Sequence, residues 1–373
     1  MTRGASNSRV RPHSKSAPKP KPASARKNAR RPRAKAMLDF EGSTYIADAV
    51  TARRNFDHNS CSRWYKKGAA PDQPGGQLAF QRLRQPLFTP KITPRFKFHR
   101  DDKLFAIGSC FARGIEQALL GRKMQVLSAA PEFASFQTIN KDVTGLGFTN
   151  KYNTFSIHNE LHWALDPEAK FPANSIVDLG NGLVVDPHIN PTLPLAGEEE
   201  TWQRRTLMQT VNRRAAECRV VIITLGLVEA WRDKEADSFI NSTPFFSLDL
   251  HPERYEFHVT NFSQNLANLE RIHALLSRFG HPDVQIVVTV SPVPLMATFS
   301  NQDIVLANTY SKSLLRTVAQ QWATAHENVD YFPSYEIVLN SERAQTWDPD
   351  LRHVRPEVTR HIMNLFLATY LSS

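Results

Sequence analysis

Short apolar runs separated by helical patterns are the feature that most constrains the fold of this chain. The three clearest runs are "KLFAIGS" (103–109), "VVIITLGL" (220–227) and "DVQIVVTVSPVPL" (283–295). We predict a strand at each of them, and the second has the continuous apolar composition of a strand buried on both faces. Strands that alternate with helices need crossover connections, which give a mostly parallel sheet with helices on both faces. We therefore predict an α/β fold, with a further strand at "VDYFPSYEIV" (329–338).

Charge divides the chain into a basic tail and a nearly neutral remainder. The 373 residues carry a net charge of +10, yet the first 36 hold twelve Lys and Arg and no Asp or Glu, and the rest holds 34 basic and 36 acidic residues. The tail has no large apolar residue between Val10 and Met37, so we predict that 1–36 is disordered. We interpret it as a solubilising extension. Contact with nucleic acid or an anionic membrane surface is the alternative.

Changes in composition also predict the domain boundaries. Residues 37–95 are expected to form an N-terminal extension, partly loop, because Gly and Pro interrupt them repeatedly. Residues 96–373 are expected to form the folded domain, with insertions over the sheet near 170–200 and 232–260.

Targeting and cysteine signals indicate a cytoplasmic protein with reduced thiols. No segment near the N-terminus resembles a secretory signal, and no stretch approaches the ~18 apolar residues of a membrane span. Cys61, Cys110 and Cys218 are widely spaced, which argues against a disulfide framework or a zinc site. We expect no transmembrane segment and no metal or nucleotide cofactor.

Polar residues gather where the predicted strands end, which is where open parallel sheets bind ligands. The candidates are Gly108, Ser109 and Cys110; Gly145, Gly147, Asn150 and Asn153; Gly226, Glu229 and Trp231; and Asp350 and His353, just ahead of the last helix. For Glu229 and Trp231 we consider two roles, lining a sugar-binding cleft or closing a turn.

Asp350 and His353 have the spacing of an acid–base pair. A carboxylate that accepts from one imidazole nitrogen leaves the other nitrogen as a base for a nucleophile. A Ser or Cys at the start of the first helix would be that nucleophile, and the helix dipole would lower the pKa of a thiol there. We favour Cys110 over Ser109. The alternative is that Cys110 is a small buried hydrophobic residue.

Several of these segments resemble one known family. "GSCFA" (108–112), "TLGLVEAW" (224–231), "SPVPLMATF" (291–299), "ANTYSKSLLR" (307–316) and "DLRHV" (350–354) resemble stretches of the GSCFA family, which is placed in the SGNH hydrolase superfamily. The resemblance extends over roughly residues 95 to 370. It implies a flavodoxin-like three-layer α/β/α fold and the reactions of esterases, lipases and carbohydrate O-acetyl transferases or esterases.

The resemblance also implies roles for single residues. The nucleophile block of the superfamily falls on 108–110 and puts Cys110 in the nucleophile position, and the Asp-x-x-His block falls on Asp350 and His353. The oxyanion-hole Asn of the superfamily is missing near Gly226, and Asn153 is considered as a replacement. The second oxyanion residue is expected in the 145–153 loop, where the choice among the candidates stays open.

These observations predict a hydrolase or O-acyltransferase that acts on an acyl ester, with an acylated carbohydrate as the substrate implied by the resemblance. A transfer reaction would use an acyl donor such as acetyl-CoA, for which no motif is present. The alternative is a catalytically silent carbohydrate-binding or scaffold protein on the same fold, which the missing Asn favours. A third hypothesis gives the functional role to the basic tail, as a nucleic-acid-binding arm.

Overall fold

The structure is a computed structural model of the chain, and the residues it describes are 45–136 and 146–372. The predicted tail over 1–36 and the candidate Gly145 lie outside the described residues. All described residues belong to one compact unit, 44–373.

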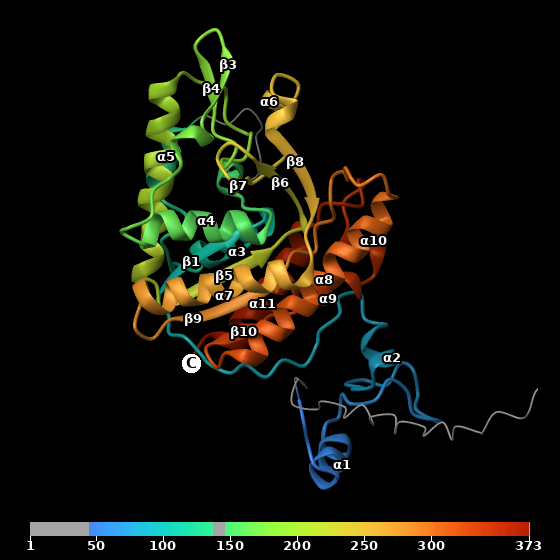
Figure 1. Cartoon of the computed structure of the whole chain (residues 1–373). Coiled ribbons are helices and arrows are strands. Elements are labelled where there is room, and N and C mark those ends of the chain that lie inside the picture. The colour runs from blue at the N-terminus through green and yellow to red at the C-terminus, as the bar shows by residue number, and fades with distance from the viewer. Residues whose placement is uncertain (1–44, 137–145, 373) are drawn as a thin grey trace, which may run out of the picture. The chain divides into compact units, whose positions relative to one another are not determined.

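The described residues form a central parallel sheet of five strands, which confirms the predicted α/β fold (Figure 1). Its strands are β1 (Lys103–Gly108), β2 (Gln125–Val126), β5 (Val220–Leu225), β9 (Gln285–Val290) and β10 (Val329–Tyr331). They lie in the order β10-β9-β5-β1-β2, and every neighbouring pair is parallel. When only these five strands are counted along the chain, the order is the 2-1-3-4-5 of flavodoxin-like folds.

Helices cover both faces of the sheet because successive strand residues point to opposite sides. In β5, Val220 and Ile222 belong to one apolar core, and Val221, Ile223 and Leu225 belong to the other. The first core is closed by α3 (Cys110–Leu120), α9 (Ser334–Leu339) and α11 (Pro356–Tyr370). The second is closed by α4 (Thr154–Leu165), α7 (Phe262–Phe279) and α8 (Ile304–Ala325). In Figure 1, α4 and α7 cross in front of the strands.

The strand predicted over 329–338 is only partly correct. Strand β10 ends at Tyr331, and the second half of the segment forms α9. Pro333 explains the change, because it has no N–H to donate to the sheet and its fixed φ suits the entry to a helix.

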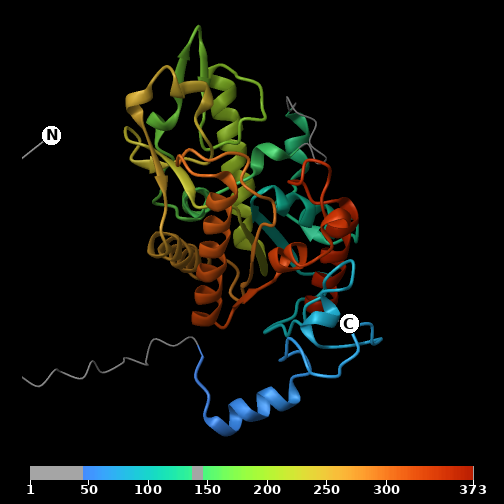
Figure 2. The ribbon, with the colours of Figure 1, turned by 90° about the vertical axis from the view of Figure 1, so that its right-hand side faces the viewer.

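Two segments between the main elements build small sheets of their own. The segment near 170–200 contains the antiparallel hairpin β3 (Val177–Gly180) and β4 (Leu183–Val185). The segment near 232–260 contains a three-stranded sheet, composed of β6 (Glu229–Asp233), β7 (Ser238–Phe239) and β8 (Tyr255–Val259). Figures 1 and 2 both show these small sheets at the same end of the unit. Hydrogen bonds such as that from the Asn174 Nδ2 to the Glu235 carbonyl join the two segments.

The remaining elements are short or peripheral. The other α-helices are α1 (Ala49–His58), α2 (Ala79–Arg82), α5 (Glu198–Arg213), α6 (Phe245–Leu248) and α10 (Arg343–Thr346). The 3-10 turns are Pro131–Ser135, Gly147–Thr149, Ala173–Ser175, Arg214–Glu217 and Pro252–Arg254. Among the described residues, no helix has the length and apolar character needed to cross a membrane.

Candidate functional site

The site lies where β1 and β5 end side by side, at the point where the strand order reverses. Gly108 closes β1 with φ of 136°, and a Cβ there would come within 2.1 Å of the Thr224 carbonyl oxygen. Only glycine fits this backbone conformation and this close approach. A crevice forms at such a reversal point, so the sequence motif at 108–110 stands at its edge.

Ser109 is the N-cap residue of α3, and its hydroxyl is held by a neighbour. The Ser109 N–H donates to the Thr224 carbonyl over 3.1 Å, and the Ser109 Oγ lies 3.2 Å from the Thr224 Oγ1. The residue is 3% exposed. Its backbone and side chain are therefore both fixed against β5.

Cys110 is the first residue of α3 and lines a cavity of about 330 Å³ together with Ser109 and Gly226. Burial raises the pKa of the Cys110 thiol, although the positive charges of Arg352 and Lys312 and the N–H groups at the helix start act in the opposite direction. The net direction is upward. The sequence argument considered the helix dipole alone and so expected the opposite sign.

Asp350 and His353 form the pair that their spacing predicted. The Asp350 Oδ1 accepts from the backbone N–H groups of Arg352 and His353, both at 3.0 Å, and the Oδ2 lies 2.5 Å from the His353 Nδ1. These backbone bonds, followed by the contact with the imidazole, lower the pKa of the Asp350 carboxyl. Leu351 takes a φ of 54° in the turn that brings both groups together.

Arg352 connects this pair to the cavity. The His353 side chain is 55% exposed, and among the described residues the cavity lining includes Arg352 and not His353. The Arg352 Nη1 donates to the His353 Nε2 over 3.1 Å. The imidazole therefore carries its proton on Nδ1, toward Asp350, and the guanidinium occupies the Nε2 lone pair that a base would use.

The walls of the cavity are largely apolar and come from outside the central sheet. They include Trp231, Phe245, Phe257, Leu295, Met296 and Phe299. The Trp231 ring packs against Phe257 and Phe299, with ring centroids 5.3 and 5.1 Å apart. Glu229 also lines the cavity, but its carboxylate accepts from the Thr298 Oγ1 at 2.5 Å and the Phe299 N–H at 3.4 Å. Glu229 thus fastens the 296–300 loop to β6.

The candidates Gly147, Asn150 and Asn153 lie near the site but do not line the cavity. The Gly147 carbonyl accepts from the Asn190 Nδ2 at 2.9 Å. The Asn150 Nδ2 donates weakly to the Tyr152 hydroxyl over 3.4 Å, and the buried Asn150 Oδ1 has no hydrogen-bond partner. A Cβ on Gly226 would lie 2.5 Å from the Tyr152 carbonyl oxygen. The loop therefore rests directly on the backbone at the end of β5.

Asn153 is the N-cap of α4, and its side chain is committed to that role. Its Oδ1 accepts from the Ser156 N–H at 2.8 Å, and its Nδ2 donates to the Ile240 carbonyl at 3.0 Å. Among the described residues, those lining the cavity do not include Asn153, Asn150 or Gly147. The amide donor considered from the sequence is thus engaged elsewhere in the structure.

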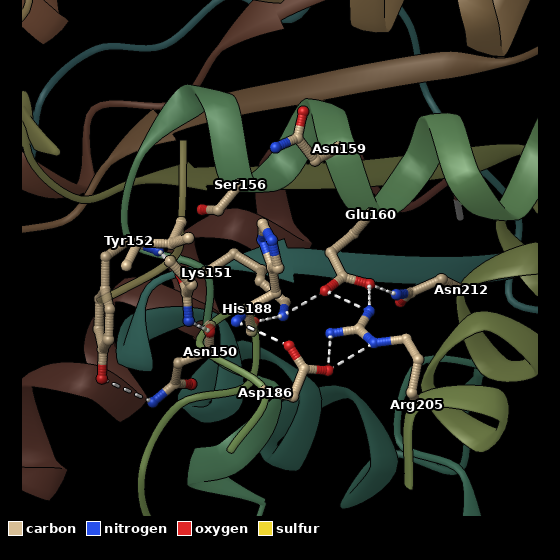
Figure 3. Close-up of polar contacts among 12 residues, drawn as sticks. Asn150, Lys151, Tyr152, Ser156, Asn159, Glu160, Asp186, His188, Arg205 and Asn212 are labelled. Atoms are coloured by element: carbon tan, nitrogen blue, oxygen red, sulfur yellow. Dashed lines mark hydrogen bonds and ion pairs between the residues drawn. The ribbon is translucent and has the colours of Figure 1, made fainter. Parts of the chain in front are cut away.

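Sequence reasoning missed a buried charged cluster behind this loop, which we call the paired cluster: Lys151, Glu160, Asp186 and Arg205 (Figure 3). The Lys151 Nζ lies 2.7 Å from Glu160, and Arg205 bridges Glu160 at 2.9 Å and Asp186 at 2.6 Å. Each cation meets a carboxylate, so the cluster is neutral. The Lys151 N–H also donates to the Gly108 carbonyl over 2.7 Å, which ties the cluster to β1.

Sequence reasoning also missed Lys312, which is 1% exposed on α8. Its Nζ donates to the Gly226 carbonyl over 2.7 Å, under the floor of the cavity. Burial lowers the pKa of Lys312 to about 7, with Cys110 raising it and Arg352 lowering it further. The available signal was a lysine on the apolar stripe of α8, between Ala307 and Leu315. We call Cys110, Lys312 and Arg352 the cysteine site.

The residues described contain no group of three or more His, Cys, Asp and Glu side chains that could hold a metal ion. The cysteine site holds a thiol and two basic side chains, and the Asp350–His353 pair contacts it through Arg352.

Comparisons with known proteins give one strong match. Residues 103–366 match the model of the GSCFA family. No curated protein matches the chain. A solved structure described as "Clostridium thermocellum family 3 carbohydrate esterase" aligns at 10% identity over 72% of this chain and 94% of that chain, with a TM-score of 0.30.

Proposed function

Because this chain belongs to the GSCFA family, we propose that it is an SGNH-type hydrolase or O-acyltransferase that acts on acyl esters through Cys110. The observation that carries the proposal is the position of Cys110. Its side chain stands at the start of α3, lines an apolar cavity, and shares that cavity with the arginine that contacts the Asp350–His353 pair.

Cys110 suits the role of nucleophile better than Ser109 for two reasons. The Ser109 hydroxyl is buried against the Thr224 Oγ1, whereas Cys110 is partly exposed at the cavity. A thiol is also the stronger nucleophile near neutral pH, because a fraction of it ionises. Since burial raises the pKa of this thiol, a base has to remove its proton during the reaction.

His353 is the proposed base, oriented by Asp350. The thiol proton passes to the Nε2 as the sulfur attacks the ester carbonyl, and the imidazolium then gives that proton to the leaving alkoxide. Water or an acceptor hydroxyl, deprotonated by His353, next attacks the thioester, which releases the acid or the new ester and restores the thiol. For the Nε2 to act, the Arg352 guanidinium has to leave its present position.

We propose the N–H groups at the start of α3 as the oxyanion donors. A helix N-terminus presents free N–H groups and a positive dipole end to a developing negative charge. Arg352, once released from His353, is the cation nearest to the same cavity. Asn153 has no part in this assignment, because its amide caps α4.

An acylated carbohydrate remains the proposed substrate, on the strength of the family resemblance. The aromatic wall formed by Trp231, Phe257 and Phe299 offers a surface on which a sugar ring or an acyl group can pack. The acceptor, and a donor such as acetyl-CoA, belong to the same proposal. A cytoplasmic location also stays a prediction.

Hydrolysis of p-nitrophenyl acetate tests the proposal, with wild type compared with Cys110→Ala, Ser109→Ala and His353→Ala. We expect activity to be lost with Cys110 and His353 and to survive in Ser109→Ala. Intact-mass measurement after rapid acid quench should show an acyl group on the Cys110 peptide. Equal rates in wild type and Cys110→Ala would overturn the assignment of the nucleophile.

One observation favours the silent binding protein as a second candidate. The His353 Nε2 is already occupied by Arg352, and the thiol is shifted toward its neutral form. Under this hypothesis, wild type and Cys110→Ala bind carbohydrate esters equally well and neither turns them over. Calorimetric titration of both variants with acetylated and non-acetylated oligosaccharides separates the two functions.

A further inference from the structure

Among the described residues, Lys312 is a buried basic side chain without a carboxylate partner. It is 1% exposed, donates a 2.7 Å hydrogen bond to the Gly226 carbonyl, and interacts electrostatically with Cys110 and Arg352. A buried ammonium that faces only a carbonyl and a second cation is costly to keep charged. The residue therefore needs either an anion nearby or a neutral amine form.

The geometry of α8 fixes Lys312 below the cavity. The neighbouring Ser311 accepts the Val228 N–H at its Oγ over 3.1 Å, which joins the helix to the segment that follows β5. Gly226, whose carbonyl binds the Lys312 Nζ, lines the cavity together with Cys110. Lys312 thus holds the backbone that lines the cavity beside Cys110, whereas Arg352 enters the cavity lining from the 350–354 loop.

Among the described acidic groups near the cavity, the Cys110 thiol is the one whose ionisation can respond to the charge of Lys312. Arg352, Lys312 and Tyr152 interact electrostatically with the sulfur, and Tyr152 has its pKa raised to about 12, by burial first and then by Cys110. Glu229 lines the same cavity, but it is hydrogen-bonded to Thr298 and the Phe299 N–H.

We propose that Lys312 is the buried counter-charge of Cys110. In its ammonium form, Lys312 stabilises the thiolate that forms when His353 takes the thiol proton, in a site that holds no free carboxylate among the described residues. The proposal rests on the proposed function in treating Cys110 as the reactive group, and His353 then gives the same proton to the leaving group.

The coupling has to be reciprocal, which makes it testable from both sides. A protonated Lys312 favours the Cys110 thiolate, so removing the lysine raises the pKa of the thiol. A Cys110 thiolate favours the ammonium, so removing the thiol lowers the pKa of Lys312.

The first experiment follows alkylation of Cys110 by iodoacetamide across the pH range, in the full chain, by mass spectrometry of the Cys110 peptide. We expect Lys312→Met to react about tenfold more slowly than wild type near neutral pH, because one unit of pKa changes the thiolate fraction about tenfold. Lys103→Met is the matched control, since Lys103 is exposed and pairs with Glu217. A Lys312→Met profile that overlays wild type overturns the proposal.

The second experiment needs no lysine variant and so stands even if Lys312→Met fails to fold. Lysine labelled with ¹³C at Cε is titrated by NMR in wild type and in Cys110→Ala. We expect the pKa of Lys312 to fall in Cys110→Ala, whereas an unchanged Lys312 titration overturns the coupling. Neither readout uses ester turnover. If Lys312 and Cys110 are coupled but the protein does not hydrolyse esters, the proposed function is wrong and this inference still holds.

Discussion

The paired cluster and the cysteine site both bury positive charge within the same domain, and they differ in what faces it. Lys151 and Arg205 each meet a carboxylate at hydrogen-bonding distance. Lys312 and Arg352 face a thiol, a carbonyl and an imidazole. A buried cation with a carboxylate partner holds segments together. A buried basic group without such a partner can instead gain or lose a proton, or stabilise a thiolate or an anionic intermediate.

The strongest test of this comparison is to remove Glu160, the central carboxylate of the paired cluster. Glu160→Gln leaves Arg205 and Lys151 short of negative charge in a fully buried position, so we expect a loss of about 3 to 5 kcal/mol in the free energy of unfolding. Urea denaturation followed by circular dichroism measures it. Glu217→Gln, at the exposed pair with Lys103, is the control and should leave the midpoint nearly unchanged. Equal effects of the two substitutions would contradict the structural role.

Removing His353, the proposed base, should lower activity and leave stability nearly unchanged. We expect His353→Ala to lower kcat/KM for p-nitrophenyl acetate about a hundredfold, the lower range of general acid–base contributions. The unfolding midpoint should stay close to wild type, since the imidazole is 55% exposed. Asp350→Asn should lower the rate less, because His353 keeps its nitrogen but loses its orientation. A large loss of stability in His353→Ala would instead assign the pair to the fold.

The Lys312→Met variant tests whether the lysine of the cysteine site contributes less to stability than the lysine of the paired cluster. Because Lys312 has no carboxylate partner in the part of the chain that the structure describes, replacing it by an apolar chain of similar length should leave the free energy of unfolding within about 1 kcal/mol of wild type. Lys151→Met, in the paired cluster, should cost several times more. The same urea experiment measures both. Similar losses would show that the two lysines serve the same structural purpose.

The last prediction concerns acid sensitivity. Burial lowers the pKa of His188, which lies beside the paired cluster, to about 4, from an ordinary value of 6.5. The unfolded chain therefore binds a proton between these values that the folded chain does not, so stability falls as the pH drops through this window. The slope is at most about 1.4 kcal/mol per pH unit. In His188→Gln the slope between these pH values should be reduced, which denaturation at several pH values can measure. An unchanged slope would assign the sensitivity to other groups.

The central sheet could be predicted because its strands are determined locally. The apolar runs at 103–109 and 220–227 form β1 and β5, which end within two residues of the predicted ends. The run at 283–295 forms β9, but that strand ends at Val290, just before Pro292 and Pro294. The same reasoning was wrong after Tyr331, where a proline ends the strand. A run of apolar residues does not show by itself where a proline divides it into two elements.

The candidate site was predictable only in part, for a related reason. The Asp350–His353 contact is local, so spacing was enough to find it. The position of Lys312 beside Gly226 depends on how α8 packs on the central sheet, and the paired cluster joins residues from 151 to 205. Such contacts between distant residues follow from the packing of whole elements, which spacing along the chain does not encode.

The two glycines at the strand ends determine how this cavity can change. At Gly108 and Gly226 the backbones of β1, β5 and the 150–153 loop meet with no room for a methyl group. The floor of the cavity is thus built from main chain and has a fixed depth. Its walls are side chains from β6, β8 and the 293–299 loop, outside the central sheet. Substitutions in the walls can therefore change the shape and polarity of the cavity, while its depth beside Cys110 stays the same.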